Sequence, residues 1–232
     1  MKWWRQMWDV SFSVSSILSS VLLGAALGNI AWGVPLDGEY EYAGTFLGLL
    51  HPYPLLVGLT TLALFMMHGS IYMVLKTEGR MHDKIRNWVN PCIIFFIITY
   101  ATTTLTTLLY VPHMTDTIKA HPLLGLVAVV NMLAIANIPR EIYWGRDFRA
   151  FLSSCVAMVC LMALFGIGMF PDIVYSNPIP EHSLTIYNAA SSQKTLGIML
   201  LIAVIGVPLV LAYTASIYWI FRGKVKLDAH SY

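Results

Sequence analysis

Six long apolar segments dominate the chain, and their length decides what it can fold into. A helix that crosses the hydrocarbon core of a bilayer needs about 20 residues, because each residue rises about 1.5 Å. Five segments reach that length, and the fourth is shorter, lying between Pro122 and Pro139. The expected spans are Val10–Gly33, Pro54–Leu75, Pro91–Val111, Leu123–Ile138, Phe151–Phe170 and Thr195–Phe221. The sequence therefore predicts an all-α integral membrane protein, with residues 1–232 forming a single membrane domain of six transmembrane helices.

The composition supports a membrane protein and argues against a soluble one. The 232 residues are 57% hydrophobic and 11% charged, whereas soluble domains carry roughly 25% charged residues. The net charge of +2 is nearly balanced, and no block of Lys and Arg resembles a phosphate-binding surface. We therefore expect membrane lipids, and no nucleic acid, around this chain.

The basic residues are distributed unevenly between the connections. Positive residues mark the cytoplasmic side of a membrane protein. The N-terminal end, the second and fourth connections and the C-terminal tail hold 12 of the 14 basic residues: Lys2, Arg5, Lys76, Arg80, Lys84, Arg86, Arg140, Arg146, Arg149, Arg222, Lys224 and Lys226. The other connections hold Lys119 and Lys194. This alternation predicts a helix bundle with its N and C termini in the cytoplasm.

No Asp, Glu, Lys or Arg lies inside the six apolar cores. Ionisable groups within a membrane are costly and usually mark an ion or proton pathway. The three cysteines, Cys92, Cys155 and Cys160, form no CxxC pair, and buried cysteine usually acts as a small apolar residue. The sequence therefore predicts no catalytic residue, no metal site and no cofactor bound by this chain.

Small residues recur at every fourth position of the first segment. Ser16, Ser20, Gly24 and Gly28 form one stripe over three helical turns, and such a stripe allows another helix backbone to approach closely. We expect these residues to serve helix packing or a subunit interface. A quinone or lipid tail in the same groove is the alternative.

His68 is the one histidine within a predicted span, and it is the best single candidate for a functional polar site. We expect it to form an interhelical hydrogen bond. A haem held by two histidines would need a second one in the membrane, although methionine can also serve as an axial ligand. A proton-relay role is a third interpretation, because histidine titrates near neutral pH.

A set of short stretches occurs in a fixed order along nearly the whole chain. The stretches are Trp4–Asp9, Gly28–Asn29, Gly33–Leu36, Gly44–Pro52, Leu55–Leu59, His68–Gly69, Lys76–Gly79, Ser183–Ile186, Asn188–Ser192, Thr195–Leu196, Tyr213–Ala215 and Phe221–Val225. Together they resemble subunit II of the cytochrome bd quinol oxidases, including the cyanide-insensitive branch.

The resemblance implies a place in a respiratory terminal oxidase of the prokaryotic cytoplasmic (inner) membrane, which oxidises quinol and reduces dioxygen to water. In that family the haem-bearing subunit I carries two b haems and one d haem. Subunit II normally holds no haem and stabilises subunit I, so the resemblance implies an accessory role. Whether a structural quinone or lipid binds is left open.

A typical member of that family has nine helices, and the resemblance implies that the first three are missing here. We expect a separate small three-helix chain to replace them, with outright loss of those helices as the alternative. Two other interpretations stay open. One is an oligomeric membrane permease, and the other is a b-type cytochrome membrane anchor that uses His68.

Overall fold

The computed structural model describes residues 2–224, and it contains the six long helices that the sequence predicts. They are α1 (Lys2–Trp32), α2 (Pro52–Lys76), α3 (Gly79–Tyr110), α5 (Gly125–Tyr143), α6 (Asp147–Met169) and α7 (Gln193–Ile220). Each is long and apolar enough to span a membrane, with a mean hydropathy of 1.6 to 2.6. The prediction of an all-α membrane protein with six spans is confirmed. Val225 and Lys226 lie outside the described residues.

The helices extend beyond several of the predicted apolar segments. α1 begins at Lys2 rather than Val10, and α3 begins at Gly79 rather than Pro91. α5 continues as far as Tyr143. A helix satisfies its own backbone hydrogen bonds, so leaving the hydrocarbon does not end it. Hydropathy therefore marks the membrane boundary and not the helix boundary.

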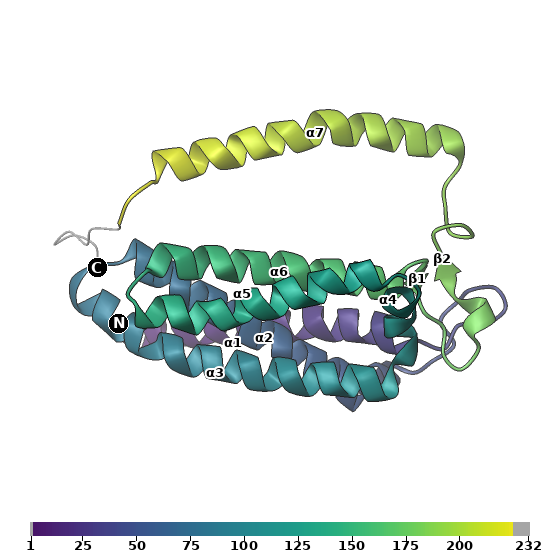
Figure 1. Ribbon diagram of the computed structural model, residues 1–232, viewed down its shortest axis with the longest axis horizontal. Helices are drawn as coiled ribbons and strands as arrows, with labels where there is room; N and C mark the ends of the chain where they lie inside the picture. The colour runs from purple at the N-terminus through teal and green to yellow at the C-terminus, as the bar shows by residue number, and fades with distance from the viewer. Residues whose placement is uncertain (1, 225–232) are drawn as a thin grey trace.

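Four helices, α2, α3, α5 and α6, form a bundle in which they run side by side (Figure 1). Its centre is mostly apolar and closed to solvent. The side chains that are 0% exposed there include Ala63, Met67, Ile71, Phe96, Ile138 and Ala157. This bundle is the one part of the described chain with an extended buried core.

The two remaining spans flank the bundle in different ways. α1 packs along α2, whereas α7 runs parallel to the bundle and stands apart from it (Figure 1). No residue of α7 is buried within the described chain. The polar contacts that join it to the bundle lie just beyond its C-terminal end, where Lys76 Nζ donates to the carbonyls of Phe221 and Gly223 at 3.3 Å each.

The end of the molecule away from both termini carries the short elements (Figure 1). They are η1 (Phe46–Leu50), η2 (Pro112–Thr115), α4 (Asp116–Ala120), η3 (Pro122–Leu124), β1 (Asp172–Val174), η4 (Pro180–His182) and β2 (Leu184–Thr185). β1 and β2 pair antiparallel. We call these elements and the loops between them the outer cap.

Candidate functional site

His68 lies on α2 and joins that helix to α6. Its Nδ1 lies 2.9 Å from the Ser154 hydroxyl oxygen, and this hydroxyl donates to the Phe151 carbonyl at 2.7 Å. Because a hydroxyl has one proton to donate, it must accept from His68, so Nδ1 carries the proton. The His68 ring also lies 5.1 Å from the Phe151 ring, centroid to centroid. The second nitrogen, Nε2, is left as an acceptor.

Gly24 and Gly28 lie where α1 comes closest to α2. A Cβ added at Gly24 would lie 2.7 Å from the Gly58 Cα, and one at Gly28 would lie 2.6 Å from the Pro54 Cα. Both distances are too short for any side chain, and both of these atoms belong to the backbone of α2; at Gly24 the Thr61 side chain lies in the way as well. These two positions therefore require glycine for the helices to pack as closely as they do.

The serines of the same stripe lie elsewhere. Ser16 is exposed and Ser20 is half-buried. Their hydroxyls donate to the Phe12 and Ser16 carbonyls one turn earlier, at 2.8 Å each. The first half of the stripe therefore faces outward from the described chain, and the second half forms the contact between α1 and α2.

Further polar pairs link the bundle helices, and only general features of the sequence indicate them. Between α2 and α3, the Thr60 and Thr103 hydroxyls lie 2.7 Å apart, and Tyr53 and Thr107 pair at 2.9 Å. The other pairs are Asn131 with Tyr100 at 3.0 Å and Asn137 with Ser153 at 2.9 Å. The threonine richness of α3 and the intramembrane asparagines are the signals that could have indicated them.

Two charged residues near the basic end of the bundle make contacts or are buried in ways that the sequence did not predict. The Arg86 guanidinium lies 2.7 Å from the Asp147 carboxylate and also donates to the Ile142 carbonyl at 3.1 Å, so it ties α3 to α5 and α6. Glu141 is only 4% exposed, and its Oε2 has no partner within the described chain. Glu141 was missed because it lies beyond the apolar segment that predicted α5.

Histidines hold the outer cap together. His113 Nε2 lies 2.9 Å from the Ala31 carbonyl at the end of α1, and its ring stacks on Tyr175 at 3.8 Å. Burial lowers the pKa of His113 from its ordinary 6.5, and burial raises the pKa of Asp172 from 3.8. Each of these two groups also weakly favours the charged form of the other. His113 thus couples α1 to the segments that follow α3 and α6.

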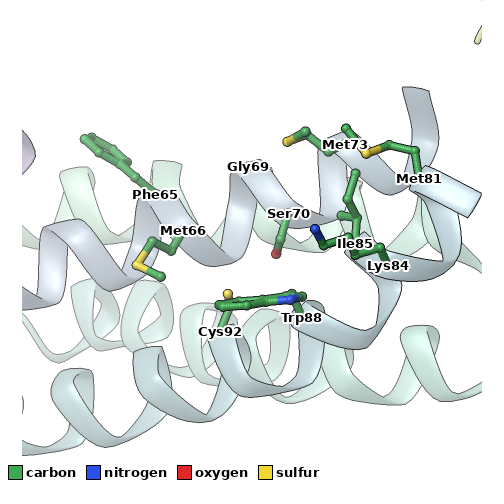
Figure 2. A pocket seen from close by; sticks show the side chains of 10 residues that line it. All are labelled: Phe65, Met66, Gly69, Ser70, Met73, Met81, Lys84, Ile85, Trp88 and Cys92. Atoms are coloured by element: carbon green, nitrogen blue, oxygen red, sulfur yellow. The ribbon is translucent and has the colours of Figure 1, made fainter. Parts of the chain in front are cut away.

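A groove of about 460 Å³ opens between α2 and α3 toward their basic ends (Figure 2). The lining residues are mostly large and apolar: Phe65, Met66, Gly69, Ser70, Met73, Met81, Lys84, Ile85, Trp88 and Cys92. Lys84 is the one charged residue among them. None of these residues belongs to the sites that the sequence predicted.

Among the residues that the structure describes, no group of three or more His, Cys, Asp or Glu side chains could hold a metal ion.

The sequence model of the cytochrome bd terminal oxidase subunit II family matches residues 1–221. The chain belongs to this family. The predicted resemblance to subunit II is confirmed.

Relatives and a solved structure agree with this assignment. The cytochrome bd-I ubiquinol oxidase subunit 2 of Escherichia coli K12 is 27% identical over 261 residues, covering 97% of this chain and 67% of the relative. The probable cytochrome oxidase subunit 2 of Haemophilus influenzae is also 27% identical, over 98% of this chain and 67% of the relative. The structure of bd oxidase from Geobacillus thermodenitrificans shares the fold, with a TM-score of 0.72, 13% identity and coverage of 95% of this chain and 66% of its own.

This subunit II-family chain therefore spans about two thirds of the length of the relatives that it matches. Its six apolar helices and its family place it in the bacterial cytoplasmic membrane, as predicted. Nearly all of its structure has a counterpart in the solved oxidase. The unmatched 5% of the chain is shorter than the 28 residues of α7, so part of α7 is included in that match.

Proposed function

We propose that the chain is a non-catalytic accessory subunit of a cytochrome bd-type terminal oxidase, which oxidises quinol and reduces dioxygen to water. The match of the subunit II family to residues 1–221 carries this proposal. The chain supports a haem-bearing subunit I in the membrane and shields part of it from lipid. The two b haems and one d haem belong to subunit I.

The polar groups of the bundle support an accessory role. Tyr53, Asn131 and His68 all bond to side chains of neighbouring helices. A haem held by two histidines does not fit these residues, because His68 is the one histidine of the predicted spans. These three side chains link helices of the bundle to one another.

We propose that α7 and the outward face of α1 pack against a separate small chain of three transmembrane helices. None of the apolar window of α7 is buried, and only 11% of that of α1 is, compared with 22% for α2, α3 and α6. About a third of the length of the matched relatives lies outside the part that this chain covers. Helices of that additional length would bury the surfaces that α1 and α7 leave open.

We also propose that both termini lie in the cytoplasm. The N- and C-terminal ends of the described chain lie at the same end of the molecule (Figure 1). Lys84 and Arg86 lie near the start of α3 at that end, Arg146 lies between α5 and α6, and an excess of basic residues favours the cytoplasmic side. Quinol is then a substrate of the whole complex and not of this chain alone.

Native mass spectrometry of the complex, extracted in mild detergent through a tag on this chain, tests the proposed function. We expect a larger chain with b and d haems, a small polytopic chain, and dioxygen consumption driven by quinol. Recovery of the tagged chain only with copies of itself, without haem, would contradict the oxidase assignment. A haem-bearing complex without a second small chain would contradict only the three-helix partner.

The position of the small chain can be tested separately by cysteine crosslinking. An added Cβ at Gly206 of α7 meets no atom within 4 Å, so Gly206→Cys should be tolerated and should crosslink to the small chain. Ala157→Cys is the control, because Ala157 is 0% exposed in the bundle. Crosslinks from Gly206→Cys to subunit I alone would show that a different partner covers α7.

A further inference from the structure

The groove between α2 and α3 has the length of one leaflet of a bilayer. On α2 it runs from Phe65 to Met73, which is roughly 12 Å along a helix, and on α3 it runs from Met81 to Cys92, roughly 16 Å. Half of the hydrocarbon core is about 15 Å thick. On α2 the groove therefore reaches from near the end of the apolar segment Pro54–Leu75 to about its middle, whereas most of its α3 side precedes the apolar segment that begins at Pro91 and lies at the membrane boundary.

The side chains that line this groove are mostly apolar, and those on α2 are exposed. Phe65, Met66 and Met73 are 42%, 40% and 44% exposed, and methionine side chains adapt readily to an irregular apolar ligand. An added Cβ at Gly69 would meet no atom within 4 Å. Unlike Gly24 and Gly28, this glycine leaves space that no part of the described chain fills.

A cation without a partner lies at the boundary end of the groove. Lys84 lines the groove together with Trp88 (Figure 2), and it forms no ion pair with any described residue. Arg80 lies one helical turn earlier, a spacing that places two side chains on the same helix face. Two positive side chains beside an apolar groove form a surface that an anion would stabilise.

We propose that the groove binds one anionic phospholipid of the leaflet at the basic end of the bundle. Its phosphate pairs with Lys84, with Arg80 adding to the positive potential, and one acyl chain lies along Phe65, Met66 and Met73. Basic pockets beside transmembrane helices on the cytoplasmic side are suited to anionic headgroups. A quinone would leave the Lys84 charge without a counter-ion, so the charge favours the phospholipid.

Lipid retention by the intact complex tests the proposal. The complex, purified through a tag on this chain, is delipidated, incubated with phosphatidylglycerol or phosphatidylcholine, and measured by native mass spectrometry. We expect phosphatidylglycerol to be retained preferentially. Lys84→Gln should weaken its binding roughly fivefold, the effect of one basic side chain near a membrane surface, and Lys84→Arg should restore most of it.

A space-filling substitution separates the groove from general lipid contact. Gly69→Leu fills the open space and should abolish the retained phospholipid while the complex stays assembled. Gly166→Leu on α6 is the control, because a Cβ there also meets nothing within 4 Å, and it should retain the lipid. Equal retention by Gly69→Leu and the wild type, equal retention of the two phospholipids, or a quinone as the retained molecule would overturn the proposal.

Discussion

In the bundle, α2, α3 and α6 each bury 22% of their apolar window, whereas α1 buries 11% and α7 none. Hydropathy does not explain the difference, because α7 has the highest value of the six helices, 2.6, and α1 has the same value as α3, 1.9. In lipid, apolarity places a helix in the membrane but does not determine which helices pack against it. Close approach of the backbones and polar side-chain pairs determine which helices pack together.

The distribution of polar pairs follows the same division. Side-chain pairs such as Thr60 with Thr103 and Asn131 with Tyr100 connect the bundle helices. α1 relies instead on glycine at its contact with α2, and the described polar contacts near α7 lie just beyond its C-terminal end. The bundle helices thus have polar links within this chain, whereas α1 and α7 leave most of their apolar surface open within the described residues.

The largest loss of intact complex is expected from substitutions at the contact between α1 and α2. Gly24→Leu or Gly28→Leu would force a side chain into backbone atoms of α2, and overpacking of this kind costs roughly 1–3 kcal/mol or more. We expect the recovery of intact complex to fall strongly for either variant. Gly69→Leu is the control on open surface. Unchanged recovery for Gly24→Leu and Gly28→Leu would show that α1 is held by something other than this contact.

The next largest loss of stability is expected when the ion pair at the basic end of the bundle is broken. Arg86→Ala leaves the Asp147 carboxylate, which is 20% exposed, without its partner, and we expect a loss of about 1–3 kcal/mol in the free energy of unfolding. Lys119→Ala is a matched control, because that residue and its partner Asp116 are both 66% exposed and such pairs contribute about 0–1 kcal/mol. Chemical denaturation in detergent measures both. Equal losses would mean that burial does not distinguish the two pairs.

The sequence predicted the membrane class and the six spans because hydropathy over about 20 residues is a strong signal. It also indicated Gly24 and Gly28, whose spacing places them on one face. It did not separate them from Ser16, which faces outward, because periodicity shows a face but not what covers it. The Arg86 link and the burial of Glu141 depend on where α3 and α5 begin and end, and hydropathy does not determine those boundaries.

A smaller effect is expected for the link between His68 and Ser154. Hydrogen bonds between membrane helices contribute about 0.6 kcal/mol on average and up to about 1.7 kcal/mol. In a double-mutant cycle of His68→Phe and Ser154→Ala, we expect a coupling energy in this range from detergent unfolding. The Thr60→Val and Thr103→Val cycle gives the comparison within the same bundle. Zero coupling for His68 with normal coupling for Thr60 would point to a role for His68 beyond helix packing.

The smallest effect concerns the attachment of α1 to the outer cap at different pH values. Burial lowers the pKa of His113 below 6.5, so the folded cap binds fewer protons than the open one. Its stability is therefore complete above pH 6.5 and decreases as the pH falls from 6.5 through the lowered pKa. Burial raises the pKa of Asp172 above 3.8, which disfavours its charged form. Protonation of Asp172 therefore opposes the loss at the acidic end of the range.

Hydrogen exchange measures this opening at two amides, Gly33, which donates to the Asn29 carbonyl, and Val34, which donates to the Tyr175 carbonyl. Between pH 7 and pH 5.5 we expect the free energy of opening to fall by less than about 1.4 kcal/mol per pH unit, the limit for one proton. His113→Gln keeps a donor for the Ala31 carbonyl and should remove this dependence. A fall in stability that persists in His113→Gln would assign the pH dependence to another group, because protonation of Asp172 acts in the opposite direction. In that case the attachment of α1 to the cap would not depend on the ionisation of His113.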